Sequence, residues 1–357
     1  MTGSLVFITG GTGFIGSHVI NATLRAGYRV LLSIRKPEQA QNVTRRYPEH
    51  ASKIETVVIS DMTKPESFKK VLSNVDFIFH LASPMPGTGT DVWTDYINPA
   101  VQTTEAILHA ALEFPQIKKV VLDSSALALL PVDALFAKEV SAKGTVPLIL
   151  PWVRIILDDF KLTIVLLDNT GEIIPVDLEA PFPEGLQGHG MKYAASKILA
   201  HQATRDFFKK NHPHYTLATF HPVFVLGESL IQESAEDIGG INAMFWQSLF
   251  SEKPIIAAGA WVHVRDVADA HVKALQAPIE PGTEFLLSGP PISWEDAVKF
   301  IRTKFPGLDC KLEPPFEGGW VVDVSTADRV LGLEWRSQET LIQDVISQQL
   351  AFQGRST

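Results

Sequence analysis

A tyrosine and a lysine four positions apart, Tyr193 and Lys197, are the side chains of this sequence best suited to moving a proton. Residues four apart on a helix lie on the same face, one turn from each other. A lysine ammonium favours the ionised form of a nearby phenol, whose free pKa is about 10. A tyrosine placed in this way can give or take a proton near neutral pH. Because the same spacing occurs on many solvated helix faces, the interpretation depends on the elements that surround the pair.

The composition narrows the class of protein. The chain has 357 residues, 45% of them hydrophobic and 20% charged, and a formal net charge of -9. The acidic balance argues against a general nucleic-acid binder. The only cysteine, Cys310, excludes an intramolecular disulfide and favours a reducing compartment. The chain begins without a signal-like segment and has no uninterrupted apolar span, so we expect a cytoplasmic protein with no membrane contact.

The first elements predict a phosphate-binding turn. The apolar run from Leu5 to Ile8 predicts a buried strand, and an apolar stripe predicts a helix over residues 14–26. Glycines between them allow a tight turn, the close approach of a pyrophosphate to the backbone, and close packing of the helix on the sheet. A purely structural turn is the alternative. The residues expected to contact a dinucleotide here are Gly10, Thr12, Gly13, Phe14, Ile15 and Gly16.

The end of the next predicted strand bears on the choice of cofactor. That strand covers residues 28–34 and ends at Arg35 and Lys36. In such folds an acidic residue at this place holds the ribose 2′-hydroxyl of NAD, whereas a basic residue accommodates the 2′-phosphate of NADP. We therefore expect NADP(H), with Arg35 and Lys36 at the phosphate. A solvated basic pair at a strand end is the alternative.

The alternation of strands and helices continues along the first half of the chain. Further strands are predicted over residues 54–59, 76–82 and 119–123, with helices over 65–72 and 92–112. This order predicts an α/β fold with a parallel, doubly wound sheet of the Rossmann type. Ligands of such sheets bind at the carboxyl ends of the strands. Ser83, Ser125 and the glycine turn all lie at those ends.

Several motifs then define a family resemblance. They are the turn at 9–16, Leu81-Ala82-Ser83-Pro84, residues 98–101, Ser124-Ser125, Tyr193-x-x-x-Lys197, His221-Pro222-Val223 and residues 261–271. Together they resemble the extended short-chain dehydrogenases/reductases. The resemblance is strongest to dihydroflavonol reductases, cinnamoyl-CoA reductases and methylglyoxal-type ketoreductases, and it covers about residues 4–350.

The resemblance implies an NADPH-dependent reductase that acts on a small or natural-product aldehyde or ketone, with a place in secondary metabolism, as a monomer or homodimer. Tyr193 would protonate the carbonyl oxygen, Lys197 would assist it and hold the nicotinamide ribose, and Ser125 would orient the substrate oxygen. Positions matching the family's other cofactor contacts are Asp61 and Met62 near the adenine, Leu81, Ala82 and Ser83 along the ribose and diphosphate, Ser124, and Pro222 and Val223 at the nicotinamide.

Two positions and one segment depart from the family pattern. Thr103 replaces a common glycine, which bears on helix packing, and His221 replaces a common asparagine, where we expect a structural histidine with satisfied hydrogen bonds. In addition, 68 positions separate Ser125 from Tyr193, which is more than the family usually has. The surplus lies at about residues 144–169. It is expected to be a lid or hairpin over the substrate, a subunit contact, or translated non-coding sequence.

The second half suggests a smaller lobe. We expect residues 1–223 to form the dinucleotide-binding core, and residues 224–357 to combine a substrate lobe with returning elements of the core. Phe245, Trp246 and Phe250 could line an apolar pocket or belong to an ordinary core. Asp266 is predicted to cap a helix over 266–275, and Ser293 to open a helix over 293–304.

Two other functions remain open. An NAD-dependent nucleotide-sugar epimerase or dehydratase shares the resemblance, but such enzymes usually carry an acidic residue where Arg35 stands. Dehydratases also place an acidic pair where Ala126 and Leu127 follow the serine. A non-catalytic NADP(H) sensor would usually lack the tyrosine or the lysine, and both are present. No spacing typical of a metal site occurs.

Overall fold

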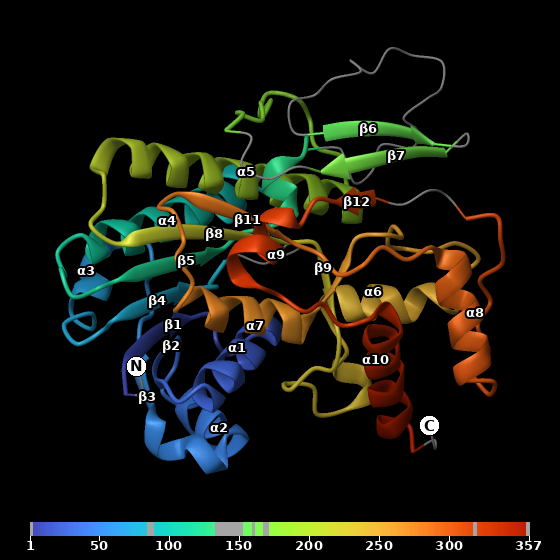
Figure 1. Ribbon diagram of the computed structural model, residues 1–357, viewed down its shortest axis with the longest axis horizontal. Coiled ribbons are helices and arrows are strands. Elements are labelled where there is room, and N and C mark those ends of the chain that lie inside the picture. The colour runs from blue at the N-terminus through green and yellow to red at the C-terminus, as the bar shows by residue number, and fades with distance from the viewer. Residues whose placement is uncertain are drawn as a thin grey trace.

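The computed structural model describes residues 3–83, 89–132, 153–158, 161–166, 171–316 and 320–354. Its centre is a seven-stranded sheet in the order β11-β8-β5-β4-β1-β2-β3, in which every neighbouring pair is parallel (Figure 1). The strands are β1 (Leu5–Thr9), β2 (Arg29–Ile34), β3 (Ile54–Val58), β4 (Phe77–His80), β5 (Lys119–Asp123), β8 (Thr216–Pro222) and β11 (Thr283–Leu287). The predicted doubly wound α/β fold is confirmed.

Helices cover both faces of this sheet (Figure 1). One layer holds α3 (Pro65–Lys69), α4 (Asn98–Ala111) and α5 (Gly185–Asn211), and the other holds α1 (Phe14–Arg25), α2 (Gln39–Arg46), α7 (Val264–Ala274) and α9 (Ser325–Leu331). Strand β1 shows the reason, because alternate side chains of a strand point to opposite faces. Its Phe7 packs with Phe68 of α3, whereas Val6 and Ile8 pack with α1 and α7.

Some helix boundaries depart from the predictions. The helix predicted over 92–112 opens with a π-helical turn, η2 (Trp93–Ile97), before α4. Thr103 lies on the buried side of α4. Helix α5 begins eight residues before Tyr193, so the tyrosine lies inside a long helix. Short 3₁₀ turns complete this part of the fold: η1 (Pro48–Lys53) and η3 (Ala126–Leu129).

A smaller lobe lies beside the sheet (Figure 1). It contains β9 (Phe224–Leu226), β10 (Trp261–His263), α6 (Gly240–Ser248), α8 (Trp294–Lys304), α10 (Gln338–Phe352) and the turn η4 (Ala235–Asp237). Phe245 is fully buried there, with its ring stacked on Trp294 and edge-on to Trp261. Phe245 is therefore a core residue. The strand β11 returns to the main sheet from this half of the chain, and the division at residue 223 stays a prediction.

Helix capping confirms one prediction and corrects another. The Ser293 hydroxyl accepts a hydrogen bond from the Asp296 backbone N–H at 3.0 Å, which caps α8 as expected. The predicted cap Asp266 is wrong, because α7 begins at Val264 and is capped by His263, whose Nδ1 accepts from Arg265 N–H. Asp266 is instead buried in the first turn and pairs with Arg336. A long-range ion pair, which local spacing does not reveal, determines the role of Asp266.

The surplus segment contains a β-hairpin. Strands β6 (Val153–Asp158) and β7 (Lys161–Leu166) pair antiparallel, and β12 (Trp320–Val322) adds to β7 in parallel. Leu166 is buried against Ala126 and Leu129 of η3 and against Leu286 of β11. The hairpin therefore ends beside the turn that follows Ser125. The rest of the 144–169 segment lies outside the described residues.

Among the residues that the structure describes, no helix combines the length and the apolar character that crossing a membrane requires.

Truncation of Phe245 should destabilise the smaller lobe. We expect Phe245→Ala to lower the free energy of unfolding by about 3–5 kcal/mol, because it leaves a cavity among large aromatic rings. Phe352→Ala, at a residue that is 38% exposed, should change it by less than about 0.5 kcal/mol. Urea denaturation of both variants measures the difference, and equal losses would contradict the assignment of Phe245 to the core.

Candidate active site

The turn between β1 and α1, residues 9–16, forms a glycine cradle in which backbone segments pack directly against one another. Gly10 has a φ of +71°, and a Cβ atom there would lie 2.6 Å from the Ala82 nitrogen. A Cβ atom on Gly16 would lie 2.3 Å from the Gly10 oxygen. Only glycine fits either position, so these close backbone contacts explain why a glycine stands at each. The turn therefore brings the N-terminus of α1, with its unpaired N–H groups, to the end of β1.

The turn that follows β4 is fixed to the same place. Leu81 N–H donates to the Thr9 carbonyl, and Ala82 N–H donates to the Thr9 hydroxyl at 3.2 Å. The carboxyl ends of β1 and β4 are thus joined by hydrogen bonds, and Ser83 follows directly. Leu81, Ala82 and Ser83 therefore lie beside the glycine turn. Pro84 lies outside the described residues.

The basic pair after β2 lies at the same edge of the sheet. Arg35 and Lys36 are exposed, and their backbone N–H groups donate to Oε1 of Gln39 at 2.8 and 3.1 Å. The side chain of Gln39 therefore shapes the loop and leaves both cationic side chains available to an anion. Because β2 is the neighbour of β1, these cations lie on the flank of the glycine turn.

Asp61 and Met62 follow β3, the outermost strand on that side. The Asp61 carboxylate accepts hydrogen bonds from the hydroxyl and the N–H of Thr63, which lower the pKa of Asp61 below its ordinary value. Met62 packs against the apolar cluster beneath α3 and α4. Asp61 thus stabilises a tight turn, and the pair forms the rim of the site farthest from Tyr193 along the sheet.

Tyr193 and Lys197 lie on one face of α5, as predicted. Lys197 is buried, with 6% of its surface exposed, and its Nζ lies 5.5 Å from the centroid of the Tyr193 ring. The Ser196 hydroxyl donates to the Tyr193 carbonyl at 2.7 Å. The ammonium therefore lies over the aromatic face of the tyrosine inside the protein, where electrostatic interactions are stronger than in water.

Ser124 and Ser125 follow β5, and α5 packs against the turn that they open. Ser124 N–H donates to the Phe220 carbonyl at 2.7 Å. The Ser125 hydroxyl accepts from Leu127 N–H at 3.2 Å, which leaves its own proton free to be donated elsewhere. Ser124 and Lys197 line one cavity, so the structure brings the serine turn and the lysine together.

His221 holds the serine turn from the neighbouring strand β8. Its Nδ1 lies 3.0 Å from the Ser125 carbonyl, and its Nε2 lies 3.0 Å from the Thr219 hydroxyl. A carbonyl can only accept, so Nδ1 carries the proton and Nε2 accepts from Thr219. The prediction of a structurally satisfied histidine is confirmed. Pro222 ends β8, and Val223 N–H donates to the Leu287 carbonyl, so both lie at the same sheet edge.

Sequence reasoning missed a group of buried and half-buried ionisable residues behind Lys197. They are His80 at the end of β4, Asp123 at the end of β5, His201 and Arg205 on α5, and Glu284 on β11. Burial, with the Lys197 charge, lowers the pKa of His80 to about 3, and burial raises the pKa of Asp123 to about 7. The sequence did carry one signal for this group, because an ionisable residue ends each of two apolar strands: His80 in β4 and Asp123 in β5.

The fold and the glycine turn define a Rossmann-type dinucleotide-binding protein. The NAD dependent epimerase/dehydratase family matches residues 6–142. Ketoreductase sphI of Aspergillus fumigatus is 34% identical over 357 residues, covering 99% of both chains. The NADPH-dependent methylglyoxal reductase GRE2 of Saccharomyces cerevisiae is 26% identical, covering 98% of this chain and 99% of the other.

A solved structure agrees with the fold. The crystal structure of yeast methylglyoxal/isovaleraldehyde reductase Gre2 complexed with NADPH has a TM-score of 0.77 and 24% identity, covering 99% of this chain and 100% of that one. The chain belongs to the extended short-chain dehydrogenase/reductase family.

The two helix-side glycines should respond differently to an added methyl group. Gly16→Ala should destabilise the cofactor-free protein by about 1–3 kcal/mol, because its Cβ would collide with backbone. Gly13→Ala is the matched control. Its Cβ would lie 3.4 Å from the Gly10 oxygen, an ordinary contact, so a change within about 0.5 kcal/mol is expected. Urea unfolding without cofactor measures both, and a stable Gly16→Ala protein would contradict the tight cradle.

Proposed function

We propose that this protein uses NADPH to reduce an aldehyde or ketone to an alcohol, with Tyr193 as the proton donor, Lys197 as its electrostatic partner and Ser125 as the group that orients the carbonyl. The buried ammonium over the Tyr193 ring, beside the serine turn, is the observation that supports this most directly. The sequence similarity to ketoreductases supports the same reaction and favours a natural-product carbonyl.

The described residues fit a dinucleotide with a 2′-phosphate. The diphosphate would lie against the glycine cradle and the N-terminus of α1, where Thr12, Phe14 and Ile15 offer backbone N–H groups, while the Gly13 N–H closes the turn on the Gly10 carbonyl. Arg35 and Lys36 would bind the 2′-phosphate. Asp61 and Met62 would border the adenine, and Leu81, Ala82, Ser83, Ser124, Pro222 and Val223 would follow the cofactor toward the nicotinamide. When bound, NADPH supplies the hydride.

The chain's own residues manage the substrate oxygen. The Ser125 hydroxyl can donate its proton to that oxygen, because its lone pair already accepts from Leu127 N–H. Tyr193 then transfers its phenolic proton as negative charge develops on the oxygen. The Lys197 ammonium stabilises the phenolate that remains, and its burial strengthens that interaction. His221 keeps the serine turn in place through the Ser125 carbonyl.

Removal of the Tyr193 hydroxyl should stop turnover and leave cofactor binding intact. We expect Tyr193→Phe to lower kcat at least about 100-fold, because the proton donor is lost. NADPH affinity, followed by fluorescence titration, should change little. Tyr28→Phe is the matched control, because Tyr28 is a buried core residue that accepts from Gln276. NADPH consumption with a panel of aldehydes and ketones, methylglyoxal included, measures turnover. Full activity in Tyr193→Phe would rule out the assigned role.

Reversal of charge at Arg35 should separate the two nicotinamide cofactors. A charged hydrogen bond is worth about 1.5–3 kcal/mol, so Arg35→Glu should raise the Kd for NADPH by about 10-fold to 100-fold. The Kd for NADH should change by no more than about threefold. Arg45→Glu, an exposed position on α2, makes the same charge change away from the expected phosphate. Equal weakening of NADPH and NADH would remove Arg35 from the 2′-phosphate site.

A further inference from the structure

Four side chains capable of moving or holding a proton or charge follow one face of α5. Tyr193, Lys197, His201 and Arg205 recur at intervals of four, the spacing that stacks residues along a helix. Lys197 and His201 are both buried, with 6% and 4% of their surfaces exposed. At the far end, Nε and Nη2 of Arg205 bind the two carboxylate oxygens of Glu284 at 2.6 and 2.7 Å. The row thus runs from the proposed proton donor to the edge strand β11.

An inner cavity of about 30 Å³ lies along this row. Lys197, His80, Asp123 and His201 line it, together with Ser124. Four buried atoms of these residues have no hydrogen-bond partner among the described residues: His80 Nε2, Asp123 Oδ1, and both Nδ1 and Nε2 of His201, the last of which lies 3.1 Å from Glu284 Oε1. Each such atom would cost about 1–3 kcal/mol if left unpaired. The cavity has the volume and the polar lining that a buried water requires.

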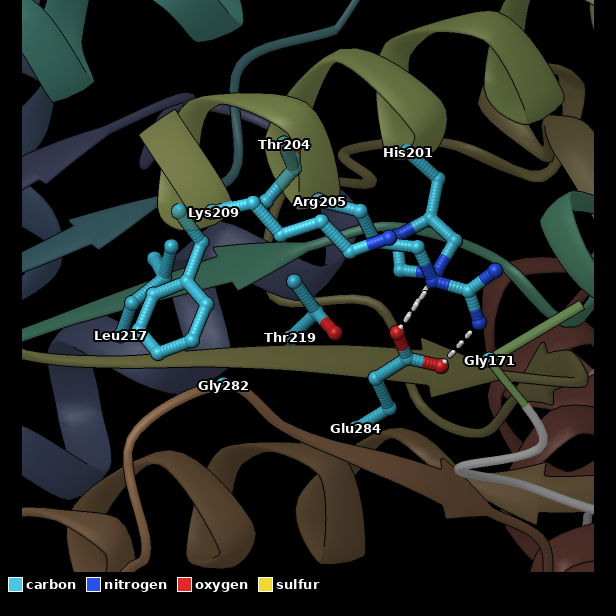
Figure 2. Close-up of a pocket in the computed structure, with 10 residues that line it drawn as sticks. Gly171, His201, Thr204, Arg205, Lys209, Leu217, Thr219, Gly282 and Glu284 are labelled. Carbon is cyan, nitrogen blue, oxygen red and sulfur yellow. Dashed lines mark hydrogen bonds and ion pairs between the residues drawn. The ribbon is translucent and has the colours of Figure 1, made fainter. Parts of the chain in front are cut away.

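An outer cavity of about 200 Å³ continues the row toward the edge of the sheet. It is lined by Arg205, Lys209, Gly282 and Glu284, and it shares His201, Thr204 and Thr219 with the inner cavity. Figure 2 shows His201 and Arg205 extending from α5 toward Glu284 on the strand below. His201 therefore stands between the two cavities, with one side toward Lys197 and the other toward Glu284.

We propose that His201 is a proton-relay residue, and that the row from the outer cavity through His201 and the inner cavity to Lys197 returns a proton to the reaction centre after each turnover. This inference rests on the proposed reductase function. His201 does not touch the substrate, so its role is one of supply and positioning.

The chemistry requires such a supply. Each reduction breaks the carbonyl π bond, places a hydride from NADPH on the carbon, and places the Tyr193 proton on the oxygen. Tyr193 is left as a phenolate and must regain one proton from solvent before the next turnover. A proton entering at the outer cavity reaches His201 and passes to water in the inner cavity. Lys197 takes it up as its ammonium gives a proton to the Tyr193 phenolate, which restores both groups. No other oxidant or reductant is needed.

The charges along the row suit this role. Burial raises the pKa of Asp123 to about 7, so Asp123 can hold or release a proton near neutrality. Glu284 Oε1 lies 3.1 Å from His201 Nε2 and can offset the charge that His201 gains. Burial alone would raise the pKa of Glu284, but the facing His201 and the hydrogen bonds from Arg205 hold it well below its ordinary range. His221 is buried and satisfied on both nitrogens, so it stays outside the route.

A metal site is the competing interpretation of the same side chains. His201, His221 and Glu284 each have a donor atom within 4.8 Å of the others. However, the Arg205 guanidinium already neutralises Glu284 through two short hydrogen bonds, and the Nε2 lone pair of His221 accepts from Thr219. A cation would have to displace both interactions. The unpartnered Nδ1 of His201, which lines the inner cavity, is better explained by water.

The decisive experiment follows NADPH consumption by His201→Ala in rapid mixing, with the best carbonyl of the panel. Tyr193 starts protonated, so the first turnover should proceed at the wild-type rate. Later turnovers should be about 100-fold slower, because relay by an acid–base group is lost. Imidazole should restore them in His201→Ala, whose truncated side chain leaves room beside the open outer cavity. It should not restore them in His201→Gln, where the space is filled. His109→Ala, an exposed histidine on α4, should behave as wild type.

Each contrary outcome has a distinct meaning. Loss of the first turnover together with the later ones would show that His201 only supports the structure, and the relay would be overturned. Wild-type steady turnover in His201→Ala, or stoichiometric zinc in the purified protein, would overturn it as well. Failure of the wild-type enzyme to oxidise NADPH with any carbonyl would instead reject the reductase function itself.

Asp123 gives an independent measurement on the same row. After the first turnover, the wild-type rate should fall as pH rises through about 7, because Asp123 loses the proton that it stores below this pH. Groups facing Asp123 from the neighbouring elements are His80, Lys197 and His201. Asp123→Asn cannot titrate, so its rate should be slower and flat across this range. A pH profile identical to wild type would remove Asp123 from the row.

Discussion

The burial of one ammonium group constrains the whole active site. Lys197 must lie close to Tyr193 and away from solvent, and moving an ion out of water costs several kcal/mol unless polar groups surround it. Polar groups at the ends of two strands offset this cost, because β4 and β5 place His80 and Asp123 beside the same small cavity as Lys197. Only a parallel sheet can do this simply, because its strands end at a common edge. The order β5-β4-β1 therefore positions the charge environment of Lys197 as well as the glycine cradle.

The features that could be predicted from the sequence are those built from residues close together in the chain. The glycine turn depends on close backbone contacts within a few residues of β1, and Tyr193 and Lys197 are related by one helical turn. Both appear directly in the sequence. The group formed by His80, Asp123, His201 and Glu284 depends on contacts between residues up to about two hundred positions apart, and only the folded chain brings them together. The prediction that Asp266 caps a helix failed for the same reason, because its partner Arg336 lies in a distant segment.

The hairpin shows a different limit of sequence reasoning. The sequence showed that the chain between Ser125 and Tyr193 is longer than usual and that the surplus is apolar. Periodicity alone, however, does not reveal which surface an inserted segment covers. The structure pairs β7 with the late strand β12 and buries Leu166 against η3, directly after Ser125. Substitutions in this hairpin can therefore act on the serine turn through packing, while the hydrogen bond from His221 supports the same turn from β8. The turn is held on two sides by elements that are far apart in the sequence.

The two halves of the site obey different physical rules, and this determines how each can vary. The cofactor half depends on the absence of side chains at Gly10 and Gly16, so almost any substitution there meets backbone. The chemical half depends on charges that balance one another around water, so one ionisable residue can replace another if the balance is kept. In this chain, Arg205 of α5 pairs with Glu284 of β11, and the same carboxylate faces His201. Variation of function on this fold is therefore expected in the ionisable residues behind Lys197 rather than in the cradle.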